Sequence, residues 1–264
     1  MRISSDDAEI DVEIAGSGSA VVLLHAFPVT RDEWDAQARD LARQALVIRP
    51  DLRGVGRSSV PEGPYLMETL AGDVAAVLDA LRVDRAAIVG HSLGGYVAMA
   101  FARMHTERVD RLALVCSRLA ADTEQAARDR NELADRAERD GSIDAIADAY
   151  LPRLFAANPE LGRKECMEKA RGMASQIAPR GAAALLRGMA QRVDSYDIAE
   201  ELPMPVLIVA GAHDAVVPRA ESEAMQRAFS NAQLQLLERS GHMPTLEEPD
   251  ELSARLRLFL CEEN

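Results

Sequence analysis

The sequence has few positive charges, and hardly any of them are lysines. Its 264 residues carry 30 Lys and Arg against 43 Asp and Glu, a formal net charge of −13, and only Lys164 and Lys169 are lysines. Acidic residues outnumber basic ones in each of residues 1–117, 118–197 and 198–264. Because nucleic acids and anionic lipid surfaces bind positive patches, we expect neither nucleic acid nor a membrane as a partner.

Cysteine is also rare, and no apolar run is long enough to cross a membrane. Cys116, Cys166 and Cys261 share no spacing typical of a metal site, which suits a reducing compartment. The longest apolar run lies near Ala20–Phe27, well short of the ~18 residues of a membrane span. Residues 1–16 alternate polar and apolar side chains, unlike a signal peptide. We therefore expect a soluble, cytoplasmic protein.

Apolar residues, in contrast, are plentiful, at 48% of the chain. A chain of this length buries about three-quarters of its unfolded surface, so it does not need metal or disulfide cross-links for stability. The length predicts one large domain or one domain with an insertion.

Short apolar runs predict the strands of a mostly parallel sheet. Continuous apolar runs are typical of strands buried on both faces. They occur at Ala20–Leu24, Leu46–Ile48, Ala86–Val89, Leu112–Val115 and Val206–Ala210, and we expect a further strand at Leu234–Leu237. Glu9–Ile14 alternates polar and apolar residues, so we expect it to form an antiparallel edge hairpin with Arg2–Ser5. The sequence therefore predicts an eight-stranded sheet.

Helical patterns separate these strands, and one stretch is helical throughout. Trp34–Ala42, Met67–Leu81, Leu93–His105 and Asp250–Leu260 alternate with the strands, which indicates an α/β fold with helices on both faces of the sheet. Residues 118–197 contain no strand-like run. Their helical patterns cover Thr123–Arg139, Ser142–Tyr150, Glu160–Gln176 and Ala182–Gln191. We therefore expect a core domain made of 1–117 and 198–264, with 118–197 as an inserted helical cap.

The strongest chemical signal is the G-x-S-x-G motif of Gly90–Gly94, with Ser92 at its centre. A buried strand precedes the motif and a helix follows it, which is the context of a nucleophile elbow. Small residues two before and two after the serine let the helix and a neighbouring strand approach closely. We therefore expect Ser92 to be a nucleophile at the carboxyl edge of the sheet.

A serine nucleophile needs a base, and the base needs an orienting acid. His242 is the last of five histidines, as the order Ser-Asp-His requires, and it lies in a loop between a strand and a helix. Asp214 directly follows the strand Val206–Ala210, where open α/β sheets place functional loops. His91, inside the elbow, is expected to point away from the site.

An acyl-transfer intermediate also needs two backbone donors for its oxyanion. The N–H of Leu93 follows the nucleophile, and the loop His25–Pro28 follows the strand Ala20–Leu24. We expect the N–H groups of Phe27 and Leu93 to form the oxyanion hole.

Together these motifs make the chain similar to serine hydrolases of the α/β-hydrolase fold, of the carboxylesterase and enol-lactonase type, over about residues 9–260. The resemblance rests on the elbow, His25–Pro28, Asp51–Ser58, Gly211–Asp214, and Gly241-His242 followed by Glu247–Pro249. Ala26 departs from the glycine usual in the family. Gly54-x-Gly56 is not followed directly by a long helix, so we interpret Asp51–Ser58 as a loop beside the pocket and not as a dinucleotide site.

The resemblance implies a cofactor-free hydrolase of small carboxylic esters or lactones. The chain lacks the H-E-x-x-H, paired CxxC and H-x-H spacings of metal sites, so we expect no metal. Both a monomer and a homodimer stay open. Two alternatives stay open. One is a carbon–carbon bond hydrolase or enol-lactonase of aromatic catabolism, and the other is a non-catalytic ligand receptor. In the cap, Met167, Met173, Leu185, Leu186 and Met189 either line an apolar acyl pocket or belong to the core, as helical spacing favours.

Overall fold

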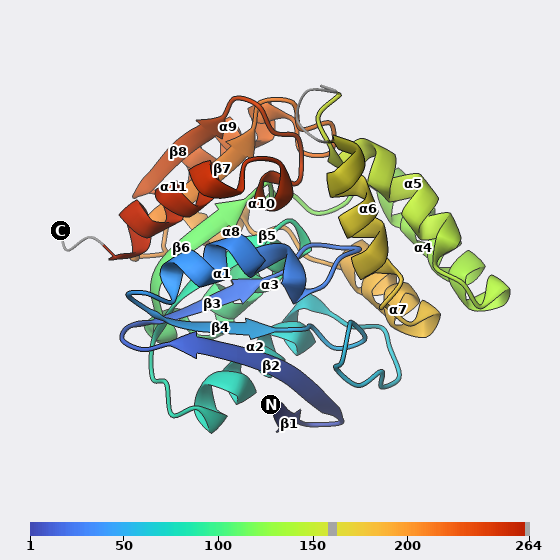
Figure 1. Ribbon diagram of the computed structural model, residues 1–264, viewed down its shortest axis with the longest axis horizontal. Helices are drawn as coiled ribbons and strands as arrows, with labels where there is room; N and C mark the ends of the chain where they lie inside the picture. Colours follow the sequence, from blue (N-terminus) through green and yellow to red (C-terminus); the bar gives the residue numbers. More distant parts are fainter. Residues whose placement is uncertain (158–162, 262–264) are drawn as a thin grey trace.

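The computed structural model describes residues 1–157 and 163–261, and an eight-stranded sheet runs through them (Figure 1). The strand order is β1-β2-β4-β3-β5-β6-β7-β8. Its strands are β1 (Arg2–Ser5), β2 (Ala8–Gly16), β3 (Ala20–Leu24), β4 (Leu46–Pro50), β5 (Ala86–His91), β6 (Val109–Val115), β7 (Val206–Gly211) and β8 (Ala232–Leu237). β1 and β2 form an antiparallel hairpin and β2 pairs antiparallel with β4, while the remaining pairs are parallel. The predicted mostly parallel α/β fold is therefore confirmed.

Alternate residues of strands β3 to β7 feed two apolar layers, one on each face of the sheet. On β3, Val21 and Leu23 pack into one layer, and Val22 and Leu24 into the other. The first layer is covered by α1 (Asp35–Leu41) and α11 (Pro249–Cys261), which contact each other. The second is covered by α2 (Met67–Ala80), α3 (Leu93–Met104) and α9 (Arg219–Ala228). Burial on both faces explains the uninterrupted apolar runs of the parallel strands.

Between β6 and β7 the described chain forms helices alone. These are α4 (Glu124–Asp140), α5 (Asp144–Leu154), α6 (Arg163–Ala174), α7 (Pro179–Ala190) and α8 (Tyr196–Ala199), and α4–α7 lie to the right of the sheet in Figure 1. α5 runs past the expected Tyr150 end and includes Pro152 in its last turn. Residues 160–162 of the expected helix 160–176 lie outside the described residues.

The insertion contacts the sheet domain through glycines as well as through apolar side chains. A Cβ on Gly181 of α7 would lie 2.2 Å from the carbonyl oxygen of Gly54, and one on Gly188 would lie 1.7 Å from that of Tyr65. Both distances are shorter than any real contact, so a larger residue at either position would push α7 away from the loop that precedes α2. None of the helices in the described ranges is long and apolar enough to span a membrane.

Candidate active site

Ser92 lies at a strained turn between β5 and α3. Its backbone has φ 51° and ψ −109°, a region that residues with a side chain seldom adopt. Two glycines make the turn possible. A Cβ on Gly90 would lie 2.2 Å from the oxygen of Gly94, and a Cβ on Gly94 would lie 2.2 Å from the oxygen of Leu24 in the neighbouring strand β3. The helix and strand thus approach as closely as the motif predicts, and the strain falls on the serine.

Ser92, His242 and Asp214 form one chain of hydrogen bonds. The Oγ of Ser92 lies 2.9 Å from Nε2 of His242, and Nδ1 of the same ring lies 2.8 Å from Oδ2 of Asp214. Ser92 follows β5 and Asp214 follows β7, while His242 lies in the loop after β8. The side chains of His242 and Asp214 are each 1% exposed. The three residues selected from the sequence therefore converge at the carboxyl edge of the sheet.

The carboxylate of Asp214 is held ionised in this buried position. Burial acts to raise its pKa, but the nearby His242 and the backbone N–H groups of Val216 and Val217 outweigh burial and hold the pKa below its usual value. Oδ1 accepts from these two amides at 2.7 and 2.8 Å, which leaves Oδ2 for the imidazole. An ionised acceptor at Nδ1 places the ring proton there and leaves Nε2 free to accept from Ser92.

The two expected oxyanion donors occupy positions compatible with that role. Leu93 is the first residue of α3, where backbone N–H groups lack an acceptor within the helix, and Phe27 lines the cavity that contains Ser92. Ala26 is not among the described non-glycine residues with positive φ, so alanine is accommodated there without that strain. Its own N–H donates to Oε1 of Glu33 at 2.7 Å.

His91 points away from the cavity, as expected, but it contacts the active-site loops in a way the sequence did not predict. Its Nδ1 lies 2.7 Å from Oε2 of Glu33, and its Nε2 lies 2.7 Å from the carbonyl oxygen of His242. His91 and Glu33 are completely buried. Burial acts to lower the pKa of His91, but the charge and hydrogen bond of Glu33 outweigh it and raise the pKa. Because Glu33 also accepts from Ala26, the pair connects the loop of Phe27 to that of His242.

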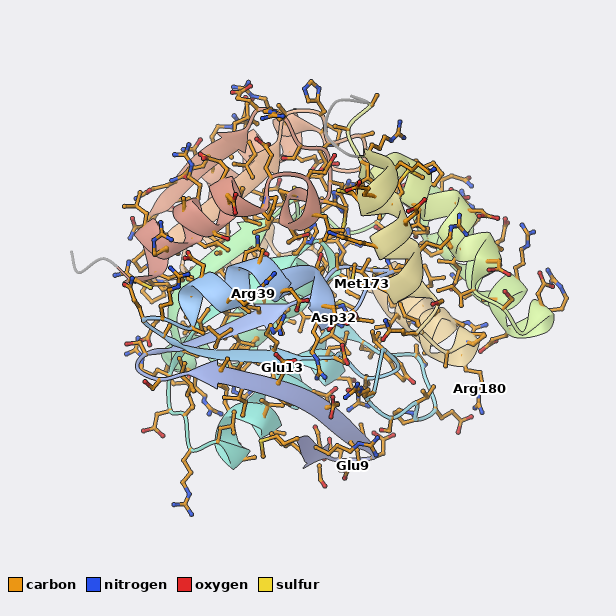
Figure 2. All side chains as sticks on the ribbon, viewed as in Figure 1. Glu9, Glu13, Asp32, Arg39, Met173 and Arg180 are labelled. Atoms are coloured by element: carbon orange, nitrogen blue, oxygen red, sulfur yellow. The ribbon has the colours of Figure 1, made fainter. Side chains whose placement is uncertain are left out.

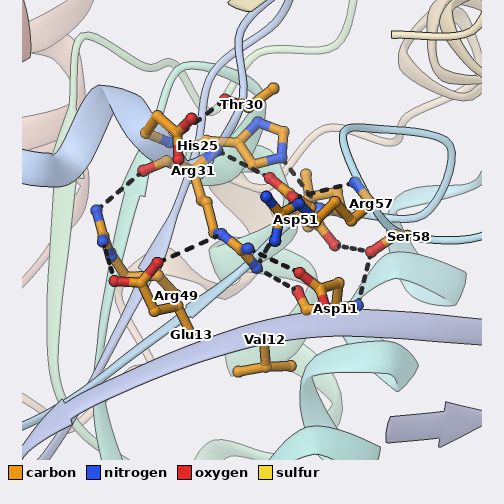
Figure 3. Close-up of polar contacts among 12 residues, drawn as sticks. Asp11, Val12, Glu13, His25, Thr30, Arg31, Arg49, Asp51, Arg57 and Ser58 are labelled. Carbon is orange, nitrogen blue, oxygen red and sulfur yellow. Dashed lines mark hydrogen bonds and ion pairs between the residues drawn. The ribbon is translucent and has the colours of Figure 1, made fainter. Parts of the chain in front are cut away.

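A second buried polar network links the segment Asp51–Ser58 to the neighbourhood of the loop His25–Pro28 (Figure 3). The side chain of Asp51 accepts from the backbone N–H groups of Arg31 and Arg57, at 3.1 and 3.3 Å. The backbone N–H of Leu52 donates to Nε2 of His25 at 3.0 Å. Gly56 has φ 56°, and a Cβ there would lie 2.3 Å from Asp51. The glycines of this segment thus shape a supporting loop, in agreement with our interpretation of the motif.

A cavity of about 270 Å³ opens over Ser92 and His242. The sheet domain contributes Phe27, Tyr96 and Val216 to its lining, and the insertion contributes residues of α4, α5 and α7. Of the five apolar candidates in the insertion, Met189 lines the cavity. Met173, Leu185 and Leu186 are buried in the core, and Met167 lines a separate surface cavity. The hypothesis of an acyl pocket made from these five residues is therefore wrong for the other four.

Charged residues also line this cavity, and the sequence did not single them out. They are Arg118, Asp122, Asp129, Arg130 and Arg153. Arg118 follows the end of β6, and a charged residue at the carboxyl edge of a buried strand was a usable signal. The other four lie further into the insertion, whose orientation over the sheet has no signature in the sequence.

Among the described residues, one group could offer three ligands to a metal. Cys116, Asp214 and His242 have ligand atoms within 4.8 Å of one another. Burial raises the pKa of Cys116 well above its ordinary value, which keeps the sulfur protonated, and metals bind the thiolate form. Asp214 and His242 are hydrogen-bonded to each other. We therefore interpret these three residues as a hydrogen-bonded Asp214–His242 pair beside the thiol of Cys116, and not as a metal site.

The fold and this site together define an α/β hydrolase, and comparisons with known proteins agree. The model of the alpha/beta hydrolase family matches residues 21–255, and the chain belongs to this family. An uncharacterized protein of Mycobacterium tuberculosis is 31% identical over 260 residues, covering 89% of this chain and 73% of that protein. The 3-oxoadipate enol-lactonase 2 of Acinetobacter baylyi is 27% identical over 230 residues, covering 87% and 84%.

Two solved structures share the whole architecture. A thermophilic esterase from Thermogutta terrifontis, solved with malate bound, has a TM-score of 0.95 and 35% sequence identity, covering 98% of this chain and 97% of that one. The enol-lactonase from Burkholderia xenovorans LB400 has a TM-score of 0.91 and 27% identity, covering 99% and 100%. These similarities support a hydrolase activity.

Proposed function

We propose that the protein is a serine hydrolase that cleaves small carboxylic esters or lactones through an acyl-enzyme on Ser92. The observation that carries the proposal is the hydrogen-bonded chain from Ser92 through His242 to Asp214, at 2.9 and 2.8 Å. The esterase and enol-lactonase neighbours favour the same reaction class.

In the first half-reaction, Oγ of Ser92 attacks the acyl carbon while Nε2 of His242 accepts its proton. The carbonyl oxygen becomes negatively charged, and the N–H groups of Phe27 and Leu93 stabilise that charge. Removing one such donor typically costs about 3–4 kcal/mol of transition-state stabilisation. Asp214 keeps the imidazole oriented and stabilises the imidazolium. The carbon–oxygen bond then breaks, and the alcohol leaves with the proton held by His242.

In the second half-reaction, water replaces the alcohol. His242 accepts a proton from the water as its oxygen attacks the acyl carbon, and then returns this proton to Oγ of Ser92 as the acid leaves. No metal or cofactor takes part in this scheme. The cavity volume of about 270 Å³ lies near the lower end of ligand-pocket volumes, roughly 300–1,000 Å³, which favours a small acyl group.

A series of p-nitrophenyl esters with increasing acyl length tests the proposal, measured for the wild type and Ser92→Ala. We expect activity that is greatest for short acyl chains and absent in the variant. Full activity in Ser92→Ala would overturn the proposal. Circular dichroism and thermal unfolding of Ser92→Ala check that the variant is folded. A loss of activity in a folded variant then reports the loss of the nucleophile.

The enol-lactonase neighbours support lactones as a second kind of substrate for the same triad. Ring-fission diketones test the carbon–carbon alternative, since turnover of these compounds without ester cleavage would favour it over the ester reaction. Tight binding of a ligand without turnover of any substrate class would favour the receptor alternative.

A further inference from the structure

The cavity over Ser92 has an excess of positive charge, although the whole protein has a net charge of −13. Three arginines and two aspartates line it: Arg118, Arg130, Arg153, Asp122 and Asp129. Of the two aspartates, Asp122 is paired with arginines and Asp129 is exposed to solvent. The question is which guanidinium groups remain available to a ligand.

Asp122 and Arg130 neutralise each other. The Nε of Arg130 lies 2.5 Å from one carboxylate oxygen of Asp122, and Nη1 of Arg192 lies 2.6 Å from the other. Nη1 of Arg130 also donates to the hydroxyl of Tyr150 at 3.0 Å. Burial acts to raise the pKa of Asp122, but the two arginines outweigh it and lower the pKa. This carboxylate therefore stays ionised and occupied.

Arg118 is a guanidinium without a carboxylate partner among the described residues. One of its terminal nitrogens donates to the carbonyl oxygen of Val216. Its Nε is buried and has no acceptor in the described part of the chain. The preceding residue, Ser117, donates from its hydroxyl to the carbonyl oxygen of Ser92 at 3.0 Å. Arg118 is therefore attached to the nucleophile's own turn and lines the same cavity.

Arg153 is the second arginine of the cavity lining without an ion-pair partner among the described residues. It lies on α5, is exposed, and makes no ion pair with the described residues. The remaining acidic member, Asp129, is also exposed and accepts from Gln125 at 2.6 Å. Solvent weakens the effect of such an exposed charge, so Asp129 does not cancel the half-buried Arg118.

We propose that the cavity selects esters or lactones whose acyl part carries a carboxylate, which Arg118 binds beside Ser92 and Arg153 attracts at the exposed side. The inference rests on the proposed hydrolase function and adds the substrate class. A guanidinium presents several N–H donors in a plane and binds carboxylates through two parallel hydrogen bonds.

Two esters of matched length test this selectivity. One is p-nitrophenyl butyrate, and the other is the mono-p-nitrophenyl ester of succinic acid, which ends in a carboxylate. We expect the wild type to have at least a ten-fold higher kcat/KM for the succinyl ester, and this ratio to fall at least ten-fold in Arg118→Gln. Arg118→Lys keeps the charge but loses the planar donors, so its ratio should lie between the two. Equal ratios in wild type and Arg118→Gln would overturn the proposal.

Arg153→Gln and Arg180→Gln separate a local effect from a change in net charge. Both variants remove one exposed positive charge, but Arg180 lies on α7 at the outer side of the insertion and does not line the cavity (Figure 2). We expect Arg153→Gln to lower the ratio two- to five-fold and Arg180→Gln to leave it unchanged. Equal falls in the two variants would contradict a role for Arg153.

Binding to Ser92→Ala distinguishes failure of this inference from failure of the hydrolase function. Calorimetric titration of that variant with succinate and with butyrate needs no turnover. Succinate binding that is lost in the double variant with Arg118→Gln would support the carboxylate site even if no ester is cleaved. Hydrolysis of neutral esters together with equal, weak binding of both acids would overturn it and leave the hydrolase function intact.

Discussion

The imidazole Nε2 of His91 lies 2.7 Å from the backbone carbonyl oxygen of His242, directly behind the ring that contacts Ser92. The other nitrogen of His91 faces the carboxylate of Glu33. Both neighbours of the ring are acceptors, so the geometry agrees with the raised pKa of His91 and favours its protonated form beside the Glu33 carboxyl group. This buried pair fixes the backbone on which His242 is carried.

Replacing Glu33 should damage both stability and activity. Glu33→Gln leaves His91 without its charge partner, and breaking a buried pair typically costs about 3–5 kcal/mol of unfolding free energy. Because the same side chain holds Ala26, we expect kcat/KM for a short-chain ester to fall about 10- to 100-fold as the donors and the base lose alignment. Urea unfolding and ester kinetics measure the two effects. The neighbouring Asp32 is exposed, so Asp32→Asn serves as the control and should change both values little.

The contribution of His91 to stability should depend on pH with a defined sign. Its pKa is raised in the folded protein, so the stabilisation is complete below the unfolded value of about 6.5 and is lost as pH rises through the folded value. We expect the difference in unfolding free energy between wild type and His91→Gln to be larger at about pH 6 than at about pH 9. A difference that grows with pH would show that His91 is not the charged partner of Glu33.

Arg53 pairs with one buried and one exposed aspartate, so the contributions of the two ion pairs to stability can be compared. Arg53 contacts Asp73 through two hydrogen bonds of 2.7 and 2.6 Å, and Asp7 at 3.0 Å. The side chain of Asp73 is 3% exposed and that of Asp7 is 62% exposed. We expect Asp73→Asn to cost about 3–5 kcal/mol and Asp7→Asn less than about 1 kcal/mol, measured by urea unfolding. Similar costs would mean that burial does not control these pairs.

Replacing glycine by alanine should have opposite effects on stability at Gly94 and Gly72. A Cβ on Gly94 would lie 2.2 Å from the backbone oxygen of Leu24, whereas a Cβ on Gly72 in α2 would meet nothing within 4 Å. Gly94→Ala should therefore cost about 3 kcal/mol or more, as overpacking against backbone does. Gly72→Ala should stabilise the helix by about 0.5–1 kcal/mol. Thermal unfolding of both variants checks the pair, and a stable Gly94→Ala would contradict the close approach at the elbow.

Local patterns were sufficient to predict the sheet and the three residues at its edge. Ser92 and Asp214 each follow an uninterrupted apolar run, and the parallel sheet brings the carboxyl ends of such runs together. The strand Ala20–Leu24 has the same bounds in the sequence prediction and the structure. The helix Arg219–Ala228 was missed because charged residues interrupt its short apolar stripe.

The cavity walls could not be predicted in the same way. Glu33 contacts His91 across 58 residues of sequence, and nothing in its neighbourhood distinguishes it from the exposed Asp32. Met173 and Met189 both have helical spacing, yet Met173 packs inward and Met189 faces the cavity. The difference depends on how the insertion is oriented over the sheet, which is a property of long-range packing.

Covalent labelling of Ser92 tests the central claim most directly. A fluorophosphonate reacts with a serine activated by a neighbouring base, and mass spectrometry of peptides identifies the labelled residue. We expect one adduct, on Ser92, that is absent in Ser92→Ala and formed much more slowly in His242→Ala. Absence of any adduct in the folded wild type, or an adduct on another serine that persists in Ser92→Ala, would contradict the account.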